Sequence, residues 1–409
     1  MVDVLAAPQQ AKADASLRTL ALISVAHWVS HFHMLVVPML FPFLKAQLGV
    51  GYVELGFALT VFAVVSALTQ APMGYLVDHA GARRILMTGL AIGGLALILL
   101  GLHLSYVSLI ATAVLLGLAN SVYHPANYAI LAAHMDEARM GRAFSIHTFA
   151  GYLGGAVAPA IVAALVMLGG GVGALITAGA IGPLVALLLL IGNVPEAGAA
   201  KHKDGSERGP QPSLITPTLI VLTILFMLLT LSSSGISNFG VVALMSGYGT
   251  PFSTANVALT AYLGTSAVGV LAGGFLADRT RRHGQFAAAC FAVNAGIVLA
   301  IAALTPPAPL LIAAMTVAGF LSGVIAPSRD MLVRAAAPAG AAGRAFGIVS
   351  TGFNIGGIMS PLLFGWIMDQ NAPHWVFGTS VVFMLMTTVL SLLIDRGPRD
   401  GATRRLTHS

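Results

Sequence analysis

Long apolar stretches, separated by short polar, glycine- or proline-containing breaks, run along almost the whole chain. Most stretches have at least the ~20 residues that an α-helix needs to cross a bilayer. The apolar stretches and their breaks predict helices at 17–47, 52–77, 84–104, 107–133, 142–168, 172–193, 214–247, 253–277, 284–304, 308–335, 342–368 and 374–394. The pattern therefore predicts an all-α membrane protein with twelve transmembrane helices.

The composition agrees with a lipid environment. Hydrophobic residues make up 57% of the 409 positions and charged residues only 8%, whereas about a quarter of the residues in soluble domains are charged. The 46 glycines and few aromatic residues favour closely packed helices over a β-barrel. A soluble protein is excluded.

One long polar stretch, 194–213, interrupts the apolar pattern near the middle of the chain. It predicts an N-terminal six-helix bundle over 1–193, a central cytoplasmic loop over 194–213 and a C-terminal six-helix bundle over 214–409.

The placement of positive charge predicts the orientation in the membrane. If the N-terminus is cytoplasmic, all of the 20 Lys and Arg residues except Lys45 and Arg329 fall on cytoplasmic segments or at their edges. Loops rich in Lys and Arg stay on the cytoplasmic side. We therefore expect a multi-pass protein of a bacterial cytoplasmic (inner) membrane with both termini in the cytoplasm. The net charge of +6 then reflects topology and the lipid bilayer, not a nucleic-acid partner.

The two halves repeat one another. The segment Gly-Tyr-Leu-Val-Asp-His-Ala-Gly-Ala-Arg-Arg at 74–84 resembles Gly-Phe-Leu-Ala-Asp-Arg-Thr-Arg-Arg at 274–282. At a constant offset of 202, positions within 117–159 match positions within 319–361, with Gly-Arg-Ala-Phe in both copies. One register held over forty residues predicts two pseudo-symmetric halves in parallel.

This arrangement resembles the major facilitator superfamily of transporters. The loop after the second helix is nearly a full copy of that family's loop motif, and the second copy has Arg281 where the first has Gly81. A finer resemblance, to fosmidomycin-resistance-type exporters, lies in 117–125 (Gly-Leu-Ala-Asn-Ser-Val-Tyr-His-Pro) and 141–147. Tyr123 replaces the Phe of their Phe-His-Pro segment, and His27 and His31 stand where many of those relatives have His followed by Asp. The family resemblance implies a central cavity lined by helices one, four, seven and ten.

Polar residues inside apolar helices are the candidates for the site, because a charge within the bilayer costs ~3 kcal/mol or more. Most of them fall on the four cavity-lining helices. The expected substrate- or proton-binding residues are His27, His31, Asn120, Tyr123, His124, Asn127, Asn238, Arg329, Asp330 and Asn354. A histidine changes charge near neutral pH and can carry a coupling proton.

Two further groups are expected to act in conformational change and packing. The cytoplasmic gating residues are Gly74, Asp78, Gly81, Arg83, Arg84, Gly274, Asp278, Arg279 and Arg282, whose charges can pair across the halves. The helix-packing residues are Gly151, Gly154, Gly155, Pro159, Gly356, Gly357 and Pro361, since small residues let helix backbones approach closely.

Some residues have a second interpretation. His33, His103 and His147 are expected to be structural, hydrogen-bonded histidines, and His27 with His31 can also form a structural pair. Arg329 favours an anionic substrate if it faces the cavity unpaired, but Arg329 and Asp330 also fit a second cytoplasmic gate. Neighbouring positions on a helix do not face each other, so the two are not expected to pair.

The sequence predicts a transporter, with proton-coupled export (H⁺ antiport) of a small organic or anionic solute as the first hypothesis. Proton-symport uptake of an organic acid is the alternative. Transition-metal transport is less favoured, because no cysteine or carboxylate completes a metal-ligand set with the histidines. A non-transporting sensor is also less favoured, because a sensor is expected to carry a soluble output domain and both ends are short. No enzyme motif is found. We expect a monomer with no cofactor and no metal.

Overall fold

A computed structural model describes residues 3–197, 216–280, 282–337 and 342–396, and the regular elements in these ranges are α-helices. We call 3–197 the N-terminal half and 216–396 the C-terminal half. The N-terminal half holds α1 (Asp3–Met39), α2 (Phe41–Leu48), α3 (Tyr52–Ala80), α4 (Ala82–Leu102), α5 (Tyr106–His134) and α6 (Glu137–Ile191). The C-terminal half holds α7 (Pro217–Tyr248), α8 (Phe252–Arg279), α9 (His283–Ala303), α10 (Ala308–Ala336), α11 (Ala342–Asp369) and α12 (His374–Arg396).

Eleven helices in the described ranges are long and apolar enough to cross a membrane. One of them, α6, contains Gly170 with φ 67° and ψ −175°, values that are not helical. The segments on either side of Gly170 are each long enough for one crossing. They correspond to the two predicted helices 142–168 and 172–193, so the described chain provides twelve potential crossings.

The prediction of a single first helix over 17–47 is wrong. The structure has two helices there, interrupted at Leu40, and α1 begins much earlier, at Asp3. Pro42 lies in the first turn of α2, where the missing N–H of proline costs no helical hydrogen bond. The other predicted helices have close counterparts in the structure.

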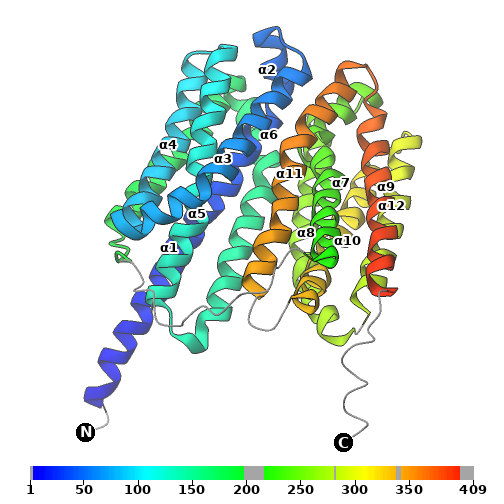
Figure 1. The fold of residues 1–409 in the computed structure, drawn as a ribbon. Helices are drawn as coiled ribbons and strands as arrows, with labels where there is room; N and C mark the ends of the chain where they lie inside the picture. The colour runs from blue at the N-terminus through cyan, green and yellow to red at the C-terminus, as the bar shows by residue number, and fades with distance from the viewer. Residues whose placement is uncertain (1–2, 198–215, 281, 338–341, 397–409) are drawn as a thin grey trace, which may run out of the picture.

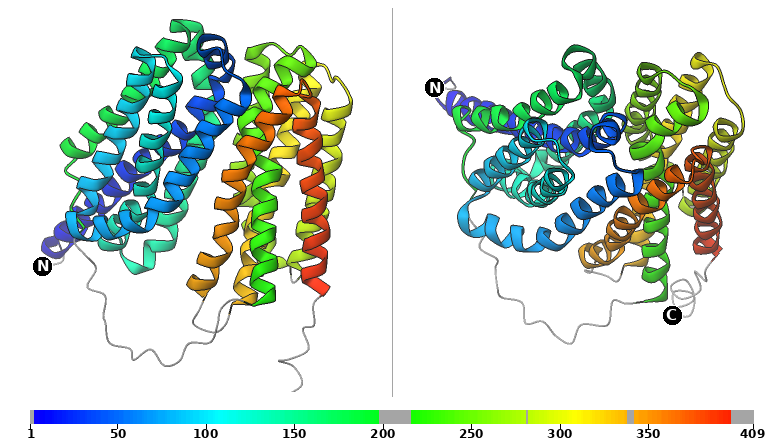
Figure 2. Two further views of the ribbon diagram at one scale, coloured as in Figure 1. Left: turned by 45° about the horizontal axis from the view of Figure 1, so that its top comes forward. Right: turned by 90° about the horizontal axis from the view of Figure 1, so that it is seen from above.

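Each half packs mainly on itself. In the N-terminal half α6 lies against α1 and α4, and α3 against α5; in the C-terminal half α8 lies against α10, α7 against α11 and α9 against α12. Figure 1 shows the two groups side by side, and the right panel of Figure 2 shows them from above. Contacts between the halves are made chiefly by α3 with α11 and α6 with α8.

Glycines set the closest helix approaches inside both halves. A β-carbon at Gly154 would overlap the backbone carbonyl of Trp28, so α6 can approach α1 only because this residue is glycine. At the repeat-related position, a β-carbon at Gly356 would clash with α7 at Met227 and Thr230. Van der Waals packing of this kind drives helix association in lipid. In contrast, Gly357 has open space around its α-carbon.

The buried core is shared by the halves at one end only. The largest cluster of buried side chains joins Phe41 to Phe239 and Phe364, and so spans both halves. Two smaller clusters, around Leu86 and around Leu222, each belong to one half. The shared cluster includes α2, which Figure 1 places at the end of the molecule opposite the start of α1 and the end of α12. We call these the far end and the terminal end.

Of the predicted central loop 194–213, the structure describes residues 194–197, and residues 198–213 lie outside the described ranges. Glu196 folds back on the start of α4, where its carboxylate accepts a hydrogen bond from the Arg83 backbone N–H at 2.7 Å. The beginning of the loop is thus anchored to the N-terminal half.

Candidate functional site

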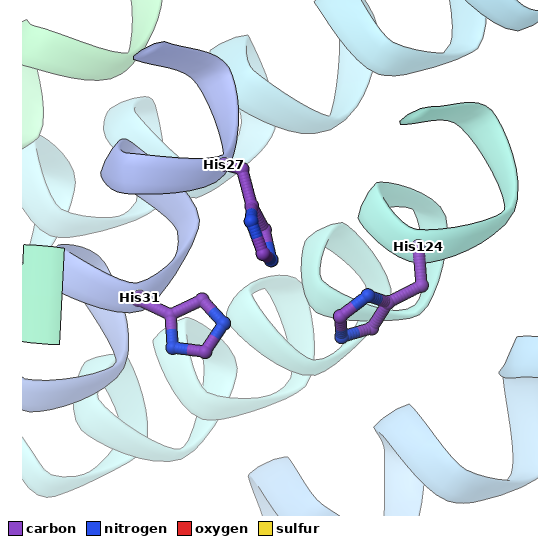
Figure 3. A group of neighbouring side chains, drawn as sticks. All are labelled: His27, His31 and His124. Carbon is purple, nitrogen blue, oxygen red and sulfur yellow. The ribbon is translucent and has the colours of Figure 1, made fainter. Parts of the chain in front are cut away.

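Three histidines meet inside the N-terminal half. His27 and His31 are one turn apart on α1, and His124 approaches them from α5 (Figure 3). Each ring offers one nitrogen, and these three nitrogens lie within 4.8 Å of one another. The His27 ring centroid is 4.7 Å from that of His31 and 5.4 Å from that of His124. The spacing i, i+4 puts both α1 rings on one face, as the sequence suggests.

A fourth histidine, His147 of α6, stacks on His27 with 4.0 Å between ring centroids. Its backbone carbonyl oxygen lies 2.8 Å from Nδ1 of His27. Both of its own ring nitrogens are buried without a hydrogen-bond partner among the described residues. The expectation of a structurally hydrogen-bonded His147 ring is therefore wrong, and His147 belongs to the histidine cluster formed by His27, His31, His124 and His147.

Gly151 explains how α6 fits against this cluster. A β-carbon at Gly151 would lie between 2.5 and 3.0 Å from ring atoms of His27. The absent side chain therefore lets the imidazole occupy this space. His33, on another face of α1, has Nε2 3.0 Å from the backbone oxygen of Ala178, which agrees with the structural role expected for it.

The other predicted residues of α5 have different surroundings. Asn120 donates a hydrogen bond to Ser66 of α3 at 2.7 Å. Tyr123 is 3% exposed and points to α4, where its hydroxyl is 3.4 Å from the Gly89 carbonyl oxygen. Asn127 is fully buried, and its amide has no partner among the described residues. Tyr123 is thus part of the packing of the N-terminal half, not of the histidine cluster.

A polar cavity of about 220 Å³ lies in the C-terminal half. Its polar lining consists of hydroxyl groups and one guanidinium: Tyr152, Thr230, Ser232, Ser233, Ser237, Tyr262, Ser266, Ser322 and Arg329. Tyr152 comes from α6 of the N-terminal half, and its ring centroid is 6.5 Å from that of His31. We call this space the hydroxyl cavity; Tyr152 lies between it and the histidine cluster.

The hydroxyl residues are absent from the predicted set. Serine and threonine inside an apolar helix usually bond to the preceding turn of their own backbone, and Ser233 and Ser237 do so with Leu229 and Ser233. Such residues are common in packed helices, so type alone does not mark them. The usable signal is the Ser232–Ser233–Ser234 run followed by Ser237 on a helix expected to line the cavity.

Arg329 is at the cavity and is paired. Its guanidinium carbon lies 4.8 Å from the Phe226 ring centroid and 5.1 Å from that of Phe353. Its Nε and Nη2 lie 2.9 and 2.8 Å from Oδ1 of Asp330. The expectation that the neighbours do not pair is therefore wrong, because the long arginine side chain reaches round the helix. Asp330 is 46% exposed.

The two predicted asparagines of the C-terminal half do not line this cavity. Asn238 donates a hydrogen bond to Ser234 at 3.0 Å, one turn away on α7. Asn354 on α11 is exposed. Both lie next to cavity-lining residues in sequence, but on other faces of their helices.

A second space, of about 340 Å³, lies between α6 and α8. It shares Tyr152 and Val270 with the hydroxyl cavity and extends to Gly274 near the end of α8. Because α8 ends at the terminal end of the molecule, this space leads from the hydroxyl cavity in that direction.

The far end is closed by contacts between the halves. The carboxylate of Asp369 at the end of α11 accepts hydrogen bonds from the backbone N–H groups of Tyr52 and Val53, both at 2.8 Å. The Lys45 ammonium lies 3.6 Å from the same carboxylate. Lys45, one of the two basic residues that fall outside the predicted cytoplasmic segments, therefore has an ion-pair partner. Thr60 donates to the Ile358 carbonyl oxygen at 2.9 Å. Asp369 is a residue that the sequence reasoning misses.

At the terminal end the predicted gating residues act within one half. Glu196 pairs with Arg83 and Arg84, at 3.8 and 3.9 Å. Gly81 has φ 97° and leaves no room for a β-carbon beside that carboxylate. Asp78 is exposed. In the C-terminal half, Arg282 donates to Gln285 at 3.4 Å and Arg279 is exposed; the side chain of Asp278 lies outside what the structure describes. The predicted pairing across the halves stays a prediction.

Of the packing residues, Gly151, Gly154 and Gly356 make the close approaches described above. The carbonyl of Pro361 leaves no room for a β-carbon at Gly56 of α3, so Pro361 contributes to contact between the halves. Gly155 is looser: a β-carbon there would meet only Leu35, at 3.8 Å. Pro159 lies buried inside α6.

Imidazole nitrogens at this spacing are also the ligand set that first-row transition metals prefer. In the part of the chain that the structure describes, His27, His31 and His124 form the group whose nitrogens could hold such an ion. The hydroxyl cavity instead offers hydroxyl groups for a polar solute, beside a guanidinium that is paired with Asp330 in this structure.

Comparison with known proteins identifies the family. Residues 23–248 and 222–408 each match the Major Facilitator Superfamily. The chain is 26% identical over 285 residues to the fosmidomycin resistance protein of Escherichia coli (strain K12), covering 68% of this chain and 69% of that protein. Over 144 residues it is 26% identical to a probable L-galactonate transporter of the same organism, covering 35% of this chain and 32% of that protein.

The fold is shared with solved transporters. A bacterial homologue of the human lysosomal transporter Spinster, in an inward-facing and occupied conformation, superposes with a TM-score of 0.75 at 16% identity, covering 92% of this chain and 96% of that one. The family resemblance inferred from the repeated loops is confirmed, and the chain belongs to the Major Facilitator Superfamily of membrane transporters.

Proposed function

We propose that this transporter exports a small organic or anionic solute in exchange for protons. The observation that carries the proposal is the meeting of two polar centres on facing halves: the histidine cluster of α1, α5 and α6, and the hydroxyl cavity of the C-terminal half, with Tyr152 between them. Polar groups at this depth in a lipid-solvated protein are costly and mark solute and ion pathways. The solute binds in the hydroxyl cavity, near Arg329, and the proton on the histidine cluster.

The mechanism is alternating access by two pseudo-symmetric six-helix bundles, 1–193 and 214–409, in a bacterial cytoplasmic membrane. With the terminal end in the cytoplasm, as the charge pattern favours, the far end is periplasmic and the structure is closed on that side. The space between α6 and α8 is then the cytoplasmic route to the site. A monomer suffices for this mechanism.

Export is favoured over uptake by the names of two relatives: the fosmidomycin resistance protein and, over a quarter of the chain, the multidrug efflux pump Tap of Mycolicibacterium fortuitum. The alternative, uptake of an organic acid with protons, is supported by the hydroxyl lining of the cavity and by the similarity to the probable L-galactonate transporter. Hydroxyl groups and a guanidinium together suit a hydroxylated carboxylate.

Everted membrane vesicles with an acidic interior separate the two directions. Fosmidomycin and galactonate serve as the two probes, added outside while interior pH is followed with a fluorescent dye. Antiport predicts that an added solute collapses the acid interior, because protons leave as the solute enters. Symport predicts collapse only when the solute is preloaded inside and leaves with protons. Vesicles that contain the His31→Ala variant are the control, and an identical response in them would remove the cluster from coupling.

A further inference from the structure

The histidine cluster has the composition and spacing of a metal site, which the sequence reasoning does not expect. We infer that His27, His31 and His124 bind one divalent first-row transition-metal ion, such as Zn²⁺ or Co²⁺. All three ligand nitrogens lie within 4.8 Å of one another, and they come from α1 and α5 of the same half. Three histidines with one open position are an established protein ligand set for Zn²⁺.

The present spacing needs only a small adjustment. Zn–N bonds of about 2.0–2.1 Å in a tetrahedral site put the nitrogens roughly 3.4 Å apart, against separations of up to 4.8 Å here. Side-chain rotation closes such a difference without movement of the helices. His31 and His124 are only partly buried, and their rings lie beside that of His27 (Figure 3).

The surroundings of His27 suit a metal ligand. Nδ1 lies 2.8 Å from the His147 carbonyl oxygen. A carbonyl can only accept, so Nδ1 carries the proton and Nε2 keeps its lone pair. Nε2 is buried and has no hydrogen-bond partner among the described residues. Metal-ligating histidines are usually held in this way, with the second ring nitrogen donating to a carbonyl or carboxylate.

A buried lone pair without a partner costs free energy, and a bound ion satisfies it. The stacked ring of His147 and the missing side chain of Gly151 hold His27 in place. Three neutral ligands leave a fourth tetrahedral position for water or for an oxygen of a solute. This proposal does not need the coupling mechanism above: the ion binds to the resting transporter through the same ring nitrogens, in place of the coupling proton.

The test is metal binding by the full-length protein, purified in detergent through an affinity tag without histidine and stripped of metal by a chelator. Co²⁺ is titrated at constant neutral pH while its visible absorption is recorded, and Zn²⁺ is then added as a competitor. We expect one Co²⁺ per chain with the intense bands of tetrahedral coordination, displaced by Zn²⁺. Mg²⁺, which prefers octahedral oxygen ligands, should not compete.

Variants locate the site. His31→Ala and His124→Ala should each weaken Co²⁺ binding by at least about tenfold. Removal of a residue that only hydrogen-bonds to a metal ligand already lowers metal affinity by about this factor, so loss of a ligand itself should cost at least as much. His33→Ala and His103→Ala are the matched controls: His33 lies on the same helix but bonds to Ala178, and His103 is exposed at the end of α4. Both should bind Co²⁺ like the parent. Thermal melting of each variant shows that it is folded.

The proposal is overturned by absence of Co²⁺ binding, by octahedral spectra alone, or by unchanged affinity in both His31→Ala and His124→Ala. These outcomes are independent of transport. A protein that binds no Co²⁺ can still exchange protons for solute in vesicles, and one that shows no proton exchange can still bind Co²⁺.

Discussion

The histidine cluster and the hydroxyl cavity both place polar groups inside an apolar protein, but they differ in whether those groups have hydrogen-bond or ion-pair partners. In the hydroxyl cavity many polar groups already have partners: Ser233 and Ser237 bond to the backbone of their own helix, and Arg329 is neutralised by Asp330 and covered by two phenylalanine rings. In the histidine cluster, buried ring nitrogens of His27, His124 and His147 have no partner among the described residues.

This difference indicates a division of work. A set of groups that is already satisfied can exchange one partner for a solute at small cost, which suits binding and release. Unpartnered imidazoles instead gain by taking up a cation. The two centres are on different halves of a repeated fold, and so a symmetric scaffold holds asymmetric chemistry.

The largest effect that separates the two centres should come from His31→Ala. We expect it to abolish transport driven by a pH gradient while leaving solute counterflow at equal pH intact, because the hydroxyl cavity is untouched. Uptake into proteoliposomes with and without a pH gradient measures both. His33→Ala is the control. Counterflow lost together with driven transport, in a folded variant, would mean that the two centres are not separate.

Arg329→Gln addresses the other centre. Loss of a charge-assisted hydrogen bond to an anionic solute, worth ~1.5–3 kcal/mol, should raise the solute concentration for half-maximal counterflow by at least about tenfold. The shape of the pH profile should stay that of the parent. Arg334→Gln, at an exposed position five residues further along α10, is the matched control. If the pH profile shifts and the half-maximal concentration does not, Arg329 serves the coupling ion and not the solute.

A smaller effect is expected from Gly151→Ala. The added β-carbon would lie within 3.0 Å of the His27 ring, so the imidazole must move and the cluster must open. We expect a severalfold loss of pH-driven transport with counterflow nearly unchanged. Gly155→Ala is the control, since its β-carbon would meet only Leu35 at 3.8 Å. Equal behaviour of the two alanine variants would show that the position of His27 does not matter for coupling.

Much of the fold follows from sequence pattern, because lipid forces every crossing segment to be helical and apolar. Apolar length therefore locates α3 to α12 well. It fails at 17–47, where the break at Leu40 does not lower the hydrophobicity and only the flanking prolines, Pro38 and Pro42, mark it. The break predicted between 168 and 172, in contrast, is present, at the non-helical φ and ψ of Gly170.

The site is predictable only where a residue type is rare in lipid. His27, His31 and His124 stand out because histidine is rare inside apolar helices, and the spacing that puts His27 and His31 on one face is visible in the sequence. Serine and threonine are ordinary in such helices, so Ser233, Ser237 and their neighbours are missed. Asp369 bonds to the backbone of Tyr52, more than three hundred positions away, and such a contact leaves no local pattern in the sequence. Tyr123 is predicted as a site residue by family resemblance alone, but its ring points to α4 and away from the histidine cluster.

The smallest effect concerns the contact that keeps both centres closed off at the far end. Asp369→Asn removes a charge from the N-terminus of α3, worth ~0.3–1 kcal/mol, and so should raise the population open at the far end about two- to fivefold. Cysteines replacing Tyr152 and Ser237, one for each half, report this opening in a Cys290→Ser background through labelling by an impermeant maleimide in intact cells. Glu54→Gln is the control, because Glu54 bonds to Gly51 within its own half. Both reporters line the hydroxyl cavity, Tyr152 from the N-terminal half and Ser237 from the C-terminal half, so both should become more accessible in Asp369→Asn and neither in Glu54→Gln. Labelling that does not rise in Asp369→Asn, or that rises equally in Glu54→Gln, would mean that the Asp369 contact does not keep the cavity closed at the far end.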